Sequence, residues 1–216
     1  NITIDSVPPS VSLITAAKAW SAVEKQDTRD NSSIKIHFNE SLESASVSVN
    51  DFVVGGSGVT NPTISAVTVA GAGASKNMYV YIDLVDDLAP NARPKVVLKG
   101  SVSDIAGNEL KPTTSEVNSG NKGKLLGTAS DGIPPTISLL SVTERLLNND
   151  GQTDFSFRSN ENLTNTSGAV GFCTCVSLSG PFGNMSTKNI SVELEDPTTG
   201  KFSFNEKENT TDGVYG

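Results

Sequence analysis

An internal repeat constrains this chain more than any other feature of its sequence. The segment Val7–Ile14, which begins Val-Pro-Pro, returns as Ile133–Leu140, which begins Ile-Pro-Pro. A second pair of similar segments, Ile34–Leu42 and Phe155–Leu163, follows the first after a spacer of similar length. Equivalent segments stand roughly 125 residues apart, the length of one ordinary domain. The repeat therefore predicts two copies of one domain in tandem.

Apolar and polar residues alternate along much of the chain, which is the pattern of strands with one buried face. The alternation is clearest in Ser33–Phe38 and Met78–Leu84, and Gly, Asn and Pro punctuate the segments between strands. Only the short, Ala-rich window Ala16–Glu24 has a helical pattern. Further strands are predicted at 11–14, 46–49, 51–54, 64–69 and 94–99. The predicted core consists of Ile34, Ile36, Phe38, Val80, Ile82, Val96 and Leu98. Many short strands at this spacing predict an all-β fold, a β-sandwich.

The repeat also sets the predicted domain boundaries. Residues 1–120 form the first sandwich, and residues 121–132, rich in Gly, Asn, Lys and Ser without periodicity, are predicted to be a linker. Residues 133–216 form a second sandwich that we expect to be incomplete. The chain begins at Asn1 without a signal segment and ends at Gly216 as if at the start of a strand. We therefore expect a piece of a longer, exported polypeptide.

Composition excludes several classes of function. The formal net charge is −8 with a pI of about 4.6, which argues against a nucleic-acid partner held by phosphate neutralisation. His37 is the only histidine, so the common catalytic triads and multi-histidine metal centres are nearly excluded. No apolar stretch approaches the roughly 18 residues needed to span a bilayer. We expect no enzymatic activity, because one Trp and three Tyr offer little for a substrate cleft.

Three features together resemble a known family. They are the Pro-Pro pair before the first strand, the strand that ends in Asn39-Glu40-Ser41-Leu42, and the closing motif Ser103–Asn108. The combination resembles the tandem bacterial-type Ig-like domains of prokaryotic cell-surface proteins, including surface-layer proteins and large adhesins. The resemblance covers nearly all of the first domain and about the first third of the second. It implies tandem Ig-like β-sandwiches with a mechanical or spacing role.

The resemblance also suggests a calcium site. In such domains the Asp of the closing motif and the Asp before Pro-Pro can share an interdomain ion, which here implies Asp104 and Asp131. Other oxygen ligands of the kind that calcium prefers are available at Asp5, Glu40 and Asn108. The alternative is that Asp104 and Asn108 only cap a tight turn, which these residue types do well without a metal.

The pattern Asn-x-Ser/Thr, which permits N-linked glycosylation, occurs eight times, about twice the frequency expected by chance. Glycans there would give hydrated cover to an exposed surface, and plain compositional bias is the alternative explanation of the excess. The predicted acceptors are Asn31, Asn162, Asn165, Asn184, Asn189 and Asn209. Asn31, Asn162, Asn165 and Asn184 are favoured among them because they stand in expected loops.

The two cysteines, Cys173 and Cys175, are separated by one residue. On a regular strand this spacing would strain a disulfide, but flanking glycines make a bent loop with a small-ring disulfide plausible. An exported location favours oxidation. Two free thiols and pairing with another part of the polypeptide stay open as alternatives.

These observations leave two functional hypotheses. The first is a non-catalytic structural module of an extracellular cell-surface assembly, a surface layer or a filament, that self-associates with neighbouring copies. The second is a spacer or ligand-binding repeat of a large adhesin. An incomplete sandwich completed by a strand of a neighbouring subunit is a third possibility, because an open sheet edge invites such pairing.

Overall fold

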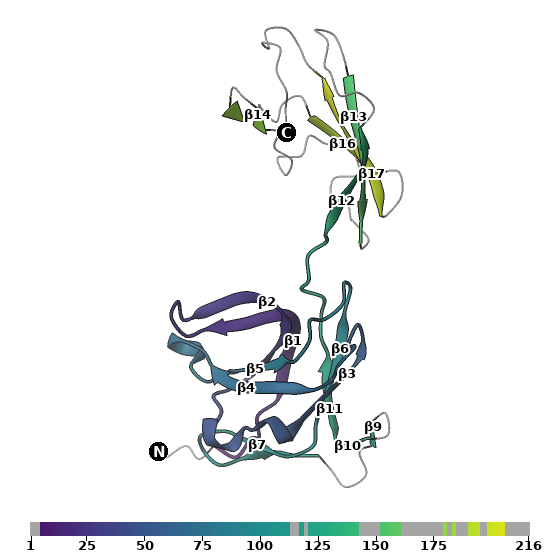
Figure 1. Cartoon of the computed structure of the whole chain (residues 1–216). Coiled ribbons are helices and arrows are strands. Elements are labelled where there is room, and N and C mark those ends of the chain that lie inside the picture. Colours follow the sequence, from purple (N-terminus) through teal and green to yellow (C-terminus); the bar gives the residue numbers. More distant parts are fainter. Residues whose placement is uncertain are drawn as a thin grey trace. The chain divides into compact units, whose positions relative to one another are not determined.

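The computed structural model describes residues 5–112, 117–118, 121–142, 152–160, 179–180, 183–184, 190–194 and 198–205. The chain divides into two compact units, Asn1–Pro134 (unit 1) and Pro135–Gly216 (unit 2). Both units are built from β-strands, and the only helices in the described part are three single 3-10 turns (Figure 1). These turns are η1 (Ser44–Ser46), η2 (Val49–Asp51) and η3 (Gly73–Ser75). The predicted all-β fold class is confirmed.

Unit 1 contains two larger antiparallel sheets (Figure 1). The first sheet has the order β1-β2-β5-β4, formed by Val11–Ser21, Gln26–Phe38, Tyr79–Leu84 and Ile64–Ala70. The second has the order β11-β6-β3, formed by Lys124–Thr128, Arg93–Leu98 and Phe52–Ser57. Four two-residue strands are β7 (Val102–Ser103), β8 (Glu109–Leu110), β9 (Val117–Asn118) and β10 (Asn121–Lys122).

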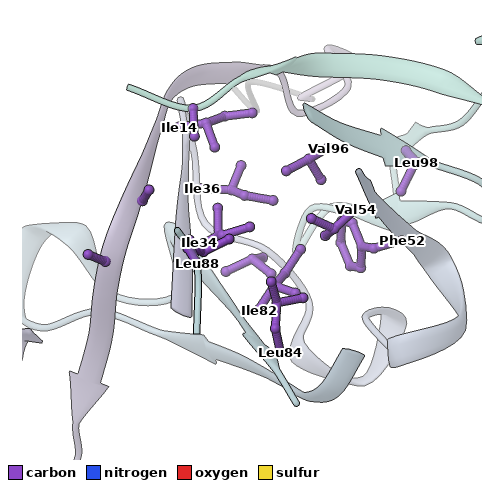
Figure 2. Close-up of a cluster of buried hydrophobic side chains, with 14 of the residues drawn as sticks. Ile14, Ile34, Ile36, Phe52, Val54, Ile82, Leu84, Leu88, Val96 and Leu98 are labelled. Atoms are coloured by element: carbon purple, nitrogen blue, oxygen red, sulfur yellow. The ribbon is translucent and has the colours of Figure 1, made fainter. Parts of the chain in front are cut away.

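The hydrophobic core of unit 1 includes side chains from both larger sheets. Ile34, Ile36 and Ile82 of the first sheet and Val54, Val96 and Leu98 of the second all belong to it (Figure 2). Each of the seven predicted core residues is buried, at 0% exposure. Because strand side chains alternate between faces, Lys35 and His37 lie on the opposite face from Ile34 and Ile36 and are only half-buried.

The helix-like window Ala16–Glu24 is extended instead. Residues up to Ser21 belong to β1, and residues 22–25 form the turn to β2. Ala16 and Ala17 are fully buried, and Ala17 has a positive φ of 58° at an irregularity in the β1–β2 pairing. Tertiary packing therefore overrides the weak helical preference of this Ala-rich segment.

The predicted linker over 121–132 is wrong for its central residues. Lys124–Thr128 form β11, which pairs antiparallel with β6. A register shift between Leu125 and Gly127 interrupts the regular alternation, so the sequence gives no period-2 signal. Just after β11, the N–H of Ser130 donates to the carbonyl of Ile14 (2.9 Å), and the N–H of Ala16 donates to the carbonyl of Ser130 (3.0 Å). The segment is thus an integral part of unit 1.

Unit 2 contains a four-stranded antiparallel sheet of order β12-β13-β17-β16. Its strands are Ile137–Val142, Gln152–Ser159, Thr199–Asn205 and Ile190–Leu194, and a further short pair consists of β14 (Ser179–Gly180) and β15 (Gly183–Asn184). The first cross-strand pair of β12 and β13, Ile137 with Ser159, is equivalent in the repeat to Val11 with Phe38 in unit 1. The two copies therefore start their first hairpin in the same register.

Hydrogen bonds repeat at the same positions in both units. The N–H of Ser10 donates to Asn39 Oδ1 (2.7 Å), and the equivalent N–H of Thr136 donates to Asn160 Oδ1 (2.7 Å). The N–H groups of the two asparagines donate back to the carbonyls of the same two residues. The sequence repeat is thus also a structural repeat of the segment that leads into each unit.

Because β11 belongs to unit 1, we expect residues 1–134 to fold cooperatively and residues 1–120 to be less stable. Removing β11 takes away the strand that pairs with β6 and exposes its apolar contacts, at a cost of about 3 kcal/mol or more. Urea unfolding followed by the fluorescence of Trp20 measures the difference. Ile36→Ala in residues 1–134, expected to cost about 2–5 kcal/mol, is the reference for core damage. Equal unfolding midpoints for the two lengths would contradict this role of β11.

Candidate functional site

Three carboxylates meet at one end of unit 1. Asp5 precedes the first Pro-Pro pair, Glu40 follows β2, and Asp104 lies in the turn after β7. One carboxylate oxygen from each lies within 4.8 Å of the others. Asp5 is exposed, Glu40 is half-buried and Asp104 is buried. We call these three residues the acidic cluster.

Asp104 organises the closing turn through its side chain. Its Oδ1 accepts the N–H groups of Ala106 and Asn108 (both 2.8 Å), and its Oδ2 accepts Asn108 Nδ2 (2.8 Å). Burial disfavours the charged form of Asp104, but these hydrogen bonds outweigh burial and hold its pKa below the usual value. The turn-capping role considered from the sequence is therefore present in the structure, whether or not a metal binds.

Glu40 is the member of the acidic cluster whose pKa is raised, by burial and by the other two members. Its partial burial, the nearby negative charges of Asp104 and Asp5, and a hydrogen bond with Asp104 raise its pKa above the usual 4.5. The charged form of Glu40 is thus disfavoured next to two other carboxylates. Carboxylate oxygens are the ligands that calcium prefers, and a bound calcium ion would offset the repulsion between these three carboxylates.

The other two predicted ligands are placed differently. Asn108 lies next to the acidic cluster and uses its amide group to donate to Asp104. β11 begins beside Leu98, at the end of β6 that leads to β7 and Asp104, and ends beside Lys95. Asp131 follows β11 and therefore lies at the opposite end of unit 1, where its Oδ1 accepts the N–H of Ile133 (3.0 Å). Figure 1 shows β7, which precedes Asp104, at the other end of this unit from the segment that follows β11. The expectation that Asp104 and Asp131 share an ion is therefore wrong within this chain.

The reason for this error lies in the repeat. Asp5 Oδ1 accepts the N–H of Val7 (3.1 Å), just as Asp131 Oδ1 accepts the N–H of Ile133. Asp131 thus stands in the second copy where Asp5 stands in the first. Asp104 meets the aspartate that leads into its own unit, and sequence spacing alone cannot distinguish the two.

A second cluster of polar and aromatic side chains lies on the outer face of the first sheet. Tyr81 Oη donates to Asp27 Oδ1 (2.7 Å), and Lys35 Nζ forms an ion pair with Asp27 (2.9 Å). Lys35 Nζ also lies 3.7 Å from the centroid of the Tyr79 ring, and the rings of Trp20 and Tyr81 are 5.9 Å apart. Asp27 and Trp20 come from the end of the β1–β2 hairpin, so these contacts hold the end of the hairpin against β5 of the same sheet.

Ionisation in this second cluster follows from its contacts. Burial raises the pKa of Tyr81, and the negative charge of Asp27 raises it further. For Asp27, burial is outweighed by hydrogen bonds from Lys35 and Tyr81, which lower its pKa. The cluster is internally paired, and Lys35 and His37 pack against the Tyr79 ring. Its geometry is that of a structural contact rather than an open stacking platform for a ligand.

A groove of about 390 Å³ runs between β1 and β11. Its lining combines Val11–Ile14 with Leu126–Ser130, and Arg93 is the one titratable residue among those that line it. The groove thus holds no pair of acid and base. No apolar helix of membrane-spanning length occurs in the described part of the chain.

The predicted modification sites are only partly described. Asn31 lies within β2 rather than in a loop, and its Oδ1 is buried without a hydrogen-bond partner. Asn184 lies in the short strand β15. The remaining predicted sites lie outside the described residues: Asn162, Asn165, Asn189, Asn209, Cys173 and Cys175. Glycosylation and the disulfide stay predictions.

Comparison with known proteins identifies the family. The bacterial Ig-like domain family matches residues 5–119, which is more than half of the chain and most of unit 1. The chain belongs to the bacterial Ig-like domain family, as its sequence motifs predicted. No curated protein matches it significantly.

Among solved structures, three of the S-layer protein SbsC are similar at low levels. The N-terminal part of this bacterial protein has a TM-score of 0.39 and 16% identity over 92% of this chain. The rSbsC(31-844) structure has a TM-score of 0.38 and 15% identity over 97% of the chain, and SbsC domains 1-6 have 0.34 and 14% over 97%. The chain spans 44%, 25% and 34% of those chains. Likeness at these levels is too low to bear on function.

The raised pKa of Glu40 leads to a pH-dependent prediction. Glu40→Gln should stabilise the protein at neutral pH in the presence of a chelator, because it removes one charge from the acidic cluster. The gain should shrink as the pH falls through the raised pKa towards 4.5 and below, where Glu40 is protonated in both folded and unfolded states. Thermal unfolding from pH 4 to pH 8 measures it, with the exposed Glu24→Gln as control. A loss of stability at neutral pH would contradict the account of Glu40.

Proposed function

We propose that this chain is a non-catalytic structural module of an extracellular cell-surface assembly, a surface layer or a filament. The observation that carries the proposal is the repeated segment leading into each unit. Both copies use an aspartate, a Pro-Pro pair and a reciprocal hydrogen-bonded pair, Ser10 with Asn39 and Thr136 with Asn160. When each unit is preceded by the same connecting segment, units can be repeated along a chain at a regular spacing. Such arrays suit a structural role rather than a catalytic one.

The polar groups of unit 1 support a structural role. Asp104 is engaged in a turn, and Asp27, Lys35 and Tyr81 fasten a hairpin. The groove between β1 and β11 offers no paired acid and base. Membership of the Ig-like family fits such a role, although a fold alone does not decide a function. The acidic net charge suits an exposed external surface, and glycans on the predicted acceptors would extend it.

We also propose that the acidic cluster binds calcium. Asp5, Glu40 and Asp104 would supply carboxylate oxygens, and the ion would neutralise their mutual repulsion. Because Asp5 lies before β1 and Asp104 after β7, the bound ion would fasten the incoming chain to the end of unit 1. This proposal differs from the interdomain ion expected from the sequence, because all three residues belong to one unit.

Calcium should raise the unfolding temperature of the whole chain. Binding to the folded state alone adds about 2.7 kcal/mol at a hundredfold excess over Kd. Asp5→Asn removes one ligand without touching the hydrogen bonds that Asp104 makes to its turn, so it should reduce the calcium effect and leave the protein folded. Differential scanning calorimetry with calcium and with chelator measures the shift, and the exposed Asp30→Asn is the matched control, because Asp30, like Asp5, accepts the N–H of the residue two positions later. A shift that is the same in Asp5→Asn and wild type would rule out this site.

The cellular role is tested by location and appearance. Immunogold labelling of intact cells, with electron microscopy of the purified material, should show dense label over the cell surface and an ordered layer or filament. Label on sparse, long fibrils would favour a spacer repeat of an adhesin instead. Label confined to the cytoplasm would reject both functions.

A further inference from the structure

The outer face of the second sheet of unit 1 carries an unusual arrangement of charge. Along β6 and the residue after it, Arg93, Lys95 and Lys99 are exposed, whereas Pro94, Val96 and Leu98 between them are buried. This alternation places the three cations on the face that points away from the core. Within the part of the chain that the structure describes, none of the three forms an ion pair.

The strands of this sheet contain no carboxylate at all. The sequences of β3, β6 and β11 include basic residues but neither Asp nor Glu, in a chain whose formal net charge is −8. β6 is the central strand of the sheet, so its cations do not serve to protect an open edge from pairing. The three strands therefore contribute only positive charge to this face, in a protein that is acidic overall.

An apolar strip crosses the same face. Val97 of β6 pairs in register with Val53 of β3 on one side and with Leu125 of β11 on the other. Leu125 is 42% exposed and Val53 is half-buried, whereas Val97 between them is only 8% exposed, so the accessible part of the strip is Leu125 and Val53. We call Val53, Val97 and Leu125, with the cations Arg93, Lys95 and Lys99, the basic face. An apolar centre with a charged rim is the pattern of a protein-binding surface.

A segment of the same chain has the complementary chemistry. Val85, directly after β5, is 55% exposed and is followed by two exposed carboxylates, Asp86 and Asp87. The N–H of Val85 donates to the carbonyl of Thr63 (3.0 Å), and the N–H of Leu88 donates to the carbonyl of Asn31 (3.0 Å). These two bonds hold the backbone of the segment at both ends, so binding would cost little further backbone entropy.

We propose that the basic face binds the Val85–Asp87 segment of a second copy of this chain. Val85 would contact the apolar strip, and Asp86 and Asp87 would lie against the cations at its rim. Because the two surfaces are different patches of one molecule, the contact can repeat from copy to copy. The inference rests on the proposed structural role and names the surfaces through which copies would meet. A hydrophilic anionic polymer would satisfy the cations but not the apolar strip.

Sedimentation equilibrium of the whole chain tests the proposal. Wild type should associate at about 50 mM salt and dissociate at about 500 mM, because screening weakens exposed charge pairs. Lys95→Glu and Asp87→Lys should each weaken association by about tenfold or more. The double variant should recover it, because each copy again offers opposite charges to the next. Lys76→Glu makes the same charge change at an exposed position outside the basic face and should behave as wild type.

Two results would overturn the inference. One is a chain that stays monomeric at every salt concentration, or that associates equally well as Lys95→Glu. The other is a monomeric chain whose binding to dextran sulfate is lost in Lys95→Glu, which would make an anionic polymer the partner of the basic face. Far-UV circular dichroism of each variant verifies the fold. A monomeric result leaves the surface labelling experiment untouched, so the two proposals fail separately.

Discussion

Two backbone hydrogen bonds join the first long strand of unit 1 to the residues that follow its last strand. Ser130 donates to the carbonyl of Ile14 and accepts from the N–H of Ala16, so the middle of β1 and the segment after β11 run side by side in parallel. This junction connects an edge of the first sheet to an edge of the second and keeps both over the shared core. Ile14, which accepts one of these bonds, is buried, and β11, which leads to Ser130, pairs with β6.

The sequence predicts the parts of the fold in which one buried face dictates the pattern. Ile34, Ile36 and Phe38 alternate without interruption, and so do Val80 and Ile82, so their burial follows from the pattern alone. β11 escapes prediction because it is short and contains a register shift between Leu125 and Gly127. The strand through Ala16 and Ala17 escapes for a different reason, since alanine fits a helix and a tightly packed strand equally well.

The candidate sites show the same limit. Asp5, Glu40 and Asp104 can be chosen from the sequence as oxygen ligands, but their meeting at one end of a sandwich depends on strand order. From the sequence, Arg93 and Lys95 look like the start of a strand. Only the pairing of β6 between β3 and β11 shows that these cations surround an apolar strip. A surface formed by side chains of several neighbouring strands cannot be predicted from the sequence of any one of these strands.

These features fit together as the properties of a repeatable module. Chain enters unit 1 beside the acidic cluster and leaves at the opposite end, next to Ser130 and Asp131, where the motif that leads into the next unit begins. Tension applied along the chain would therefore act through the unit from end to end. The parallel junction between β1 and Ser130 would resist it in shear, with its hydrogen bonds loaded together.

Pulling single molecules by their two ends tests this account most directly. We expect unit 1 to unfold in one abrupt event that releases about 3.5 Å for each residue freed. Ser130→Pro lacks the N–H that donates to Ile14, so it should lower the unfolding force. Gradual extension at low force, with no separate event and no difference between wild type and Ser130→Pro, would contradict the view of this chain as a mechanical module.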